Sequence, residues 1–183
     1  MEDRNVRLES ATFGGGCFWC TEAVFKDLKG VHEVKPGYMG GQLPEPTYEQ
    51  VCTGETGHAE VIRVLFDPEV ISYGQLLGVF FSTHDPTQLN RQGNDVGTQY
   101  RSVIFARTAE QSAAAEAFIG QLEADGVFSA PVVTAVENEQ EFWEAEEVHH
   151  DYYARNPEQG YCAVVIAPKV NRFRQEYADL LSG

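Results

Sequence analysis

Two cysteines near the start of the chain have the residue type and spacing for thiol chemistry. Cys17 follows the glycines at 14–16, and Cys20 comes three residues later. A helix N-terminus stabilises a thiolate because its unpaired N–H groups and its dipole favour negative charge. If a helix begins at Cys17, we expect its thiol pKa to be lowered into the range of about 3.5 to 7.5. A lone cysteine is more often a buried small apolar residue, but the glycines and the adjoining Phe18 and Trp19 favour a nucleophile here.

The spacing of Cys17 and Cys20 also allows a redox pair. Residues three apart on a helix have Cβ atoms about 5–6 Å apart, whereas a disulfide needs about 3.8 Å. A modest adjustment of the first helical turn would close that gap. The alternative is that Cys20 packs on the apolar face of the helix, and the spacing leaves both interpretations open.

A zinc site is the competing use of cysteine. Structural zinc needs four ligands, commonly from two closely spaced pairs. Here Cys52 and Cys162 are isolated, and neither His58 with Glu60 nor the acidic and histidine run at 146–150 has a typical ligand spacing. We therefore expect no metal site.

Glu60 is a candidate proton donor. Strand parity places it on one face with Ile62, Val64 and Phe66. Burial near an apolar face raises a carboxyl pKa, so the group could stay protonated and donate to a substrate oxygen. The alternative is a solvent-exposed Glu60 paired with His58 at the strand end.

Two long polar segments, 42–57 and 84–98, supply or adjoin further polar candidates. They place Tyr48, Asp95 and Tyr100 in or next to loops, and loops of this length in a compact domain are usually functional. Tyrosine hydroxyls are neutral donors to an oxygen that gains negative charge, although a single loop tyrosine is more often a structural anchor.

The elements that position these residues follow from the hydrophobic periodicity. We expect strands at 8–13, 31–38, 58–66, 100–106 and 131–137, helices at 17–28, 73–81, 109–124, about 144–155 and 170–180, and a short strand or extended segment at 162–167. This order predicts an α+β fold, a two-layer sandwich with a mixed sheet built on a ferredoxin-like split βαβ core.

Composition narrows the class of protein. The 183 residues suit one domain spanning 1–183, and 28 acidic against 13 basic residues leave a net charge of −15. That charge disfavours nucleic-acid binding. The charged start of the chain and its short apolar runs predict no leader and no membrane span, hence a cytoplasmic protein. We expect a monomer.

Four motifs together resemble one known family. The segments GGGCFWCTE, TGHAE, GNDVGTQYRS and QGYC occur in this order within residues 8–177. The chain is similar to the A-type peptide methionine sulfoxide reductases. The resemblance implies a two-layer α+β fold and reduction of the S epimer of methionine sulfoxide, free or in peptides and proteins. It implies no metal or organic cofactor and thioredoxin as the reductant.

The resemblance also assigns roles to residues. Cys17 matches the nucleophile that becomes a sulfenic acid, and Glu60 matches the acid that protonates the sulfoxide oxygen. Phe18 and Trp19 match the pocket for the substrate methyl group. The residues that match the remaining polar partners of the oxygen are Tyr48, Asp95 and Tyr100.

The chain departs from the family pattern at the resolving thiol. Many members have glycine at the position of Cys20 and recycling cysteines in a C-terminal tail, whereas no cysteine follows Cys162 here. Cys20 is therefore the expected resolving thiol, with Cys162 and Cys52, which look like packing residues, as the alternatives. Two other classes of protein remain: a thioredoxin-like dithiol oxidoreductase, which would explain the cysteine pair, and a non-catalytic peptide-binding module, which would explain the aromatic residues.

Overall fold

The computed structural model describes residues 7–181, and its centre is a six-stranded mixed sheet. The strand order is β7-β6-β1-β3-β2-β8. All neighbouring strands pair antiparallel except β6 and β7. The strands of the sheet are β1 (Glu9–Gly15), β2 (Val31–Met39), β3 (Ala59–Phe66), β6 (Ser102–Ala106), β7 (Ala135–Asn138) and β8 (Trp143–Glu144). A separate two-stranded hairpin consists of β4 (Arg91–Gln92) and β5 (Asp95–Val96).

The four central strands form the expected split βαβ core. β1 and β2 each pair antiparallel with β3, so they run parallel to one another with β3 between them. Helix α1 (Phe18–Phe25) connects β1 to β2, and α3 (Tyr73–Ser82) connects β3 toward β6. The β-α-β-β-α-β order with β6-β1-β3-β2 across the sheet is the ferredoxin-like arrangement. The expected fold class is confirmed.

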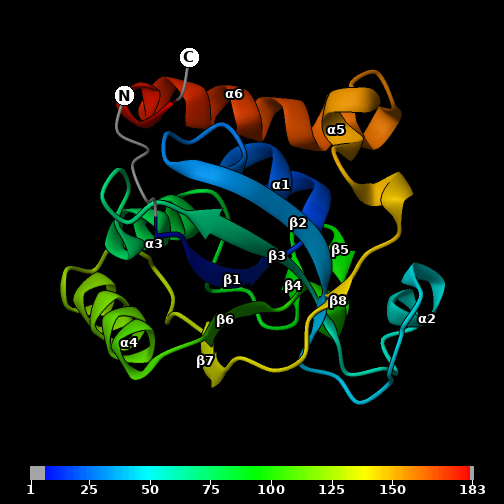
Figure 1. Cartoon of the computed structure of the whole chain (residues 1–183), viewed down its shortest axis with the longest axis horizontal. Coiled ribbons are helices and arrows are strands. Elements are labelled where there is room, and N and C mark those ends of the chain that lie inside the picture. The colour runs from blue at the N-terminus through cyan, green and yellow to red at the C-terminus, as the bar shows by residue number, and fades with distance from the viewer. Residues whose placement is uncertain (1–6, 182–183) are drawn as a thin grey trace.

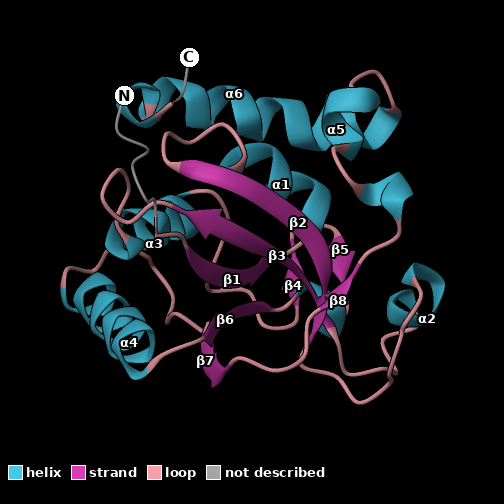
Figure 2. Ribbon diagram, viewed as in Figure 1, coloured by secondary structure: helices cyan, strands magenta, loops and turns pink. Residues whose placement is uncertain are grey.

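The helices cover one face of the sheet. Ile62, Val64 and Phe66 of β3 pack in the larger core cluster with residues of α1 and α3. The alternate residues Ala59 and Val61 belong to a smaller cluster on the opposite face. Figure 1 shows α6 (Ala167–Glu176) alongside α1, and α4 (Ala109–Ala124) beside α3. Figure 2 shows α2 (Tyr48–Cys52) set apart from the sheet between loop segments.

Side-chain caps fix where three helices begin. Ser72 and Thr47 each form a capping box with the glutamine three residues later, at the starts of α3 and α2. Thr108 accepts the N–H of Gln111 at the start of α4. Each cap satisfies backbone N–H groups that the helix itself leaves without partners.

The C-terminal third differs most from the expectation. The short strand or extended segment predicted at 162–167 is wrong, because Cys162–Ile166 forms a π-helical segment, η3, that continues into α6. The predicted helix at about 144–155 is two pieces, η2 (Glu147–His149) and α5 (Tyr152–Arg155). Asp151 separates them with a left-handed φ of 54°. The remaining short helices are η1 (Thr98–Tyr100) and η4 (Ala178–Leu180). None of the helices within residues 7–181 has the length and apolar composition to cross a membrane.

Candidate functional site

The turn between β1 and α1 places Cys17 at the start of the helix. Cys17 is the N-cap residue, and its carbonyl accepts the N–H of Cys20 at 3.0 Å. Gly16 has a φ of 100°, and a Cβ there would lie 2.8 Å from the Gln92 side chain. A Cβ at Gly15 would lie 2.9 Å from the Phe80 ring. Glycine at both positions lets the chain turn tightly enough to bring Cys17 into the site.

The thiol of Cys17 is buried, with 7% of the residue exposed. Burial raises its pKa well above the usual value, and its hydrogen bond to Cys20 and the charge of Glu60 act in the same direction. The expectation of a lowered pKa is therefore wrong for the resting protein. The helix start is present, but the thiol has lost the water that would stabilise its charged form.

Glu60 lies on β3 directly behind the start of α1. Its Oε1 accepts the N–H of Phe18 at 3.1 Å, and only 1% of the residue is exposed. Within residues 7–181 its Oε2 has no hydrogen-bond partner. Burial raises the carboxyl pKa to about 8, against the effect of the Phe18 N–H. The side chain is thus a neutral carboxylic acid near pH 7, as strand parity indicated, and not a partner of His58.

The hydroxyls of two tyrosines are close enough to Glu60 for its charge to raise their pKa. Tyr48 begins α2 and Tyr100 ends η1, and both are half-buried. Burial, followed by the charge of Glu60, raises the pKa of each hydroxyl. Both are therefore neutral hydrogen-bond donors at physiological pH.

An aromatic cluster adjoins the cysteine on the side of Phe18 and Trp19. The Trp19 ring stacks on Tyr152 with centroids 3.8 Å apart, and Phe18 lies 6.2 Å from the ring of Tyr48. Trp19 Nε1 donates to Nδ1 of His149 at 3.1 Å. Burial lowers the pKa of His149, so its ring is neutral and its Nδ1 can accept. The cluster forms an apolar wall held in a fixed orientation.

A second group of residues lies on the other side of Cys17. A cavity of about 290 Å³, here called the thiol cavity, has Cys17 and Cys20 in its lining together with Asp95, Tyr161 and Lys169. The Tyr161 hydroxyl donates to Asp95 Oδ2 at 2.5 Å. Asp95 is thus bound to Tyr161 and not to Glu60, although its charge still contributes to the raised Glu60 pKa.

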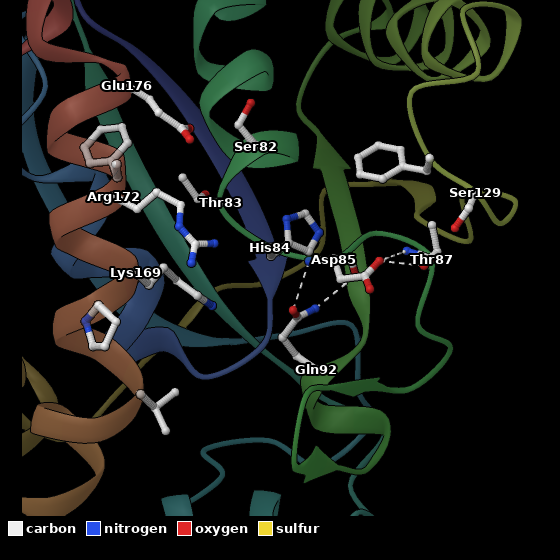
Figure 3. Close-up of a pocket in the computed structure, with 14 residues that line it drawn as sticks. Ser82, Thr83, His84, Asp85, Thr87, Gln92, Ser129, Lys169, Arg172 and Glu176 are labelled. Carbon is white, nitrogen blue, oxygen red and sulfur yellow. Dashed lines mark hydrogen bonds between the residues drawn. The ribbon is translucent and has the colours of Figure 1, made fainter.

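An adjoining cavity of about 510 Å³ shares Gln92, Val165 and Lys169 with the thiol cavity. Figure 3 shows Lys169 and Arg172 extending from α6 toward His84 and Gln92. His84 is fixed between the Phe80 carbonyl and the Ser102 hydroxyl. Burial lowers its pKa to about 4, which leaves it neutral and structural.

The four cysteines are all free thiols, in three different settings. Cys17 and Cys20 share the thiol cavity. Cys162 is buried in η3, as expected of a packing residue. Cys52 is exposed at the end of α2, so its expected role in packing is wrong. In the part of the chain that the structure describes, no group of three His, Cys, Asp or Glu residues could hold a metal ion.

The sequence patterns did not indicate four residues of the site: His149, Tyr152, Tyr161 and Lys169. His149 and Trp19 are 130 positions apart, so no local pattern connects them. Glu146 adds a further long-range link, because its carboxylate accepts both the Tyr38 hydroxyl and the Tyr48 N–H at 3.0 Å. Aromatic residues among charges in 138–160 were the available signal, but their pairing required the fold.

Comparisons with known proteins agree with these observations. The family model described as "Peptide methionine sulfoxide reductase" matches residues 9–181. The chain is 58% identical to peptide methionine sulfoxide reductase MsrA of Deinococcus radiodurans over 94% of this chain and 84% of that protein. It is 54% identical to the MsrA of Sulfolobus acidocaldarius over 96% and 98% of the two chains.

Solved structures are similar as well. Mxr1 of Saccharomyces cerevisiae in reduced form matches with a TM-score of 0.79 and 32% identity, covering 87% of this chain and 94% of that one. Methionine sulfoxide reductase A of Corynebacterium diphtheriae gives a TM-score of 0.75 and 34% identity, over 90% and 81%. Mxr1 is also known in complex with Trx2, a structure whose 24% identity and TM-score of 0.58, over 82% and 89% of the two chains, show the fold alone.

Proposed function

Because the chain belongs to the A-type peptide methionine sulfoxide reductases, we propose that it reduces the S epimer of methionine sulfoxide, free or in peptides and proteins, to methionine. The family identifies the protein as an oxidoreductase. The observation that carries the more specific proposal is the placement of a buried, protonated Glu60 against the N–H of Phe18, the residue next to Cys17.

In the first step, the Cys17 sulfur attacks the sulfoxide sulfur, and the proton that its thiol loses replaces the one that Glu60 gives to the oxygen. Glu60 donates a proton to the sulfoxide oxygen, and Tyr48 and Tyr100 donate hydrogen bonds to it. A sulfurane-like intermediate collapses, the oxygen passes to Cys17, and methionine leaves. Cys17 remains as a sulfenic acid. Atoms balance, since a thiol and a sulfoxide give a sulfenic acid and a sulfide.

Preference for one epimer follows from the two unlike sides of the site. The oxygen needs the acid and hydroxyls of Glu60, Tyr48 and Tyr100, whereas the methyl group needs the apolar wall of Phe18 and Trp19. The opposite epimer would place its methyl group against buried polar hydrogens. Leaving such groups unpaired is unfavourable by about 1–3 kcal/mol each.

In the second step, Cys20 condenses with the Cys17 sulfenic acid to a disulfide and water. The shared thiol cavity and the hydrogen bond between the two thiols support Cys20 over Cys162 and Cys52. The disulfide is then opened by exchange with a dithiol reductant. We assign this role to thioredoxin by family resemblance, and the complex of the yeast relative with Trx2 is consistent with it.

We also propose that residues 1–183 act as one domain, as a monomer, in the cytoplasm. One chain supplies all the residues assigned to the reaction. Its four free cysteines suit a reducing compartment, where recycling by dithiols operates.

The experiment that tests the function is turnover of separated sulfoxide epimers with dithiothreitol. We expect catalytic methionine formation from the S epimer and little or none from the R epimer. Reduction that is stoichiometric or blind to the epimer would contradict the proposal. Catalytic reduction of a protein disulfide such as that of insulin, without sulfoxide turnover, would instead identify a thioredoxin-like oxidoreductase.

A further inference from the structure

Among residues 7–181, Lys169 is the one cationic residue that lines the thiol cavity. Cys17, Cys20 and Asp95 line the same space. The negative charge of Asp95 is engaged by the hydroxyl of Tyr161. Asp95 therefore has another partner, and the positive charge of Lys169 lies in the cavity that the two sulfur atoms share.

The helical segment that carries Lys169 presents one face to this cavity. Tyr161, Val165 and Lys169 recur every four residues, so they share one face of the continuous helical segment. Its first turns are the π-helical segment η3, a geometry found often at functional sites. In Figure 1, α6 lies alongside α1, the helix that carries Cys20.

The ammonium group of Lys169 is unpaired. In the span 7–181 it has no hydrogen bond and no ion pair, although the residue is half-buried. By contrast, Lys26, Lys35 and Arg174 each form an ion pair with a carboxylate. In a chain with a net charge of −15, a partly buried cation without a carboxylate partner calls for another anion.

The following inference rests on the proposed function. We propose that Lys169 is a positioning residue for the resolving step, because it holds Cys20 as a thiolate for attack on the Cys17 sulfenic acid. The Cys20 sulfur attacks the Cys17 sulfur, an S–S bond forms and the S–O bond breaks. Hydroxide leaves and becomes water on taking a proton. Cys20 is oxidised and Cys17 is reduced.

Lysine is suited to this step because the larger hydrogen-bond contribution, from Cys17, is lost in the first step, and the smaller one, from Tyr161, is shared with Asp95. The pKa of Cys20 is lowered, first by the hydrogen bond from the Cys17 thiol and then, against burial, by the charge of Lys169. After the first step the Cys17 sulfur no longer carries that S–H donor. Tyr161 also lowers the Cys20 pKa through a hydrogen bond, but by less than the charge of Lys169 does, and its hydroxyl donates to Asp95 at 2.5 Å. The groups that act on Cys20 electrostatically are Cys17, Glu60, Asp95, Tyr161, Cys162 and Lys169, and Lys169 is the cation among them.

The test separates the resolving step from the first step. Reduced Lys169→Met, Lys169→Arg and wild-type proteins are mixed with excess S sulfoxide without reductant between about pH 6 and pH 10. Methionine release reports the first step. Loss of thiols, with dimedone capture of sulfenic acid, reports the second. Arg172→Met is the matched control, because Arg172 lies three residues along α6 and faces the adjoining cavity.

We expect Lys169→Met to slow disulfide formation relative to methionine release, on the order of fivefold to tenfold near neutral pH. The deficit should shrink as pH rises, because Cys20 then ionises without help. Lys169→Arg and Arg172→Met should match the wild type.

A deficit of the same size at every pH, a deficit that arginine does not rescue, or no deficit at all would overturn the proposal. A wild-type protein that releases no methionine would refute the proposed function instead. A wild-type disulfide that excludes Cys20 would refute the choice of resolving thiol and this inference with it.

Discussion

The groups on the two sides of Cys17 have pKa values that shift in opposite directions. On the acid side, formed by Glu60, Tyr48 and Tyr100, burial raises every pKa and keeps the groups neutral and able to donate. On the side of the thiol cavity, the pKa of Cys20 is lowered even though the residue is buried.

This difference shows how one buried sulfur can serve two steps. The first step needs a proton delivered to oxygen, and the second needs a thiolate next to the oxidised sulfur. Desolvation is the largest cause of the raised Glu60 pKa, and the negative charges of Asp95 and Cys20 act in the same direction, so the carboxyl stays protonated. The thiolate needs a hydrogen-bond donor and a nearby cation to offset the same desolvation.

Among the substitutions considered, Glu60→Gln on the acid side should reduce the rate of methionine formation most. The amide can still accept the Phe18 N–H but cannot protonate the sulfoxide oxygen. We expect single-turnover methionine formation to fall about 10²- to 10³-fold, while iodoacetamide still alkylates Cys17. Glu22→Gln is the matched control, since Glu22 is also buried with its pKa raised to about 7 but lies away from the cavity.

The same substitution should raise stability. The folded-state pKa of Glu60 lies above its usual value of 4.5, so folding favours the protonated form and wild-type stability falls between about pH 4.5 and pH 8. Denaturant titration should find Glu60→Gln more stable than wild type near pH 7, by on the order of 1–3 kcal/mol. Little difference should remain below about pH 4.5. Unchanged activity, or lost stability at pH 7, would remove the acid from the account.

On the side of the thiol cavity, Cys20→Ser should prevent formation of the disulfide. We expect the first turnover to persist, with dimedone-reactive sulfenic acid accumulating, because serine cannot close a disulfide. Thioredoxin-driven steady-state turnover should drop more than about tenfold. Cys162→Ser is the control and should recycle normally. The reverse pattern would identify Cys162 as the resolving thiol.

A pH profile sharpens the comparison without mutation. Glu60 loses its proton as pH rises through about 8, so the single-turnover rate of methionine formation should fall roughly tenfold per pH unit above that value. Cys20 should ionise at lower pH than Cys17. A rate that is independent of pH from about 8 to 9.5, at constant substrate saturation, would contradict an acid role for Glu60.

The smallest effect concerns the apolar wall. His149→Phe keeps a ring beside Tyr48 but leaves the Trp19 N–H without its acceptor. We expect kcat/KM for a sulfoxide peptide to fall severalfold, which corresponds to about 1 kcal/mol. His149→Gln can accept through its amide oxygen and should recover most of the loss. Equal losses in both variants would show that the hydrogen bond does not orient the wall.

Local sequence patterns predicted the parts of the fold that local rules decide. The alternation in β3 and the periodic apolar residues of α3 are short-range features. The apolar segment at 162–167 is too short for periodicity to separate a strand from a helix, and the protein forms a π-helical turn there. At the site, Cys17 and Glu60 stood out by residue type, whereas His149 and Lys169 depend on contacts between distant segments.

The most direct test of the account is a disulfide map. Reduced protein is treated with excess S sulfoxide without reductant, alkylated and digested, and the linked peptides are identified by mass spectrometry. The account predicts one equivalent of methionine released as a Cys17–Cys20 bond forms. A bond from Cys17 to Cys162 or Cys52, or a stable sulfenic acid with Cys20 still free, would contradict it.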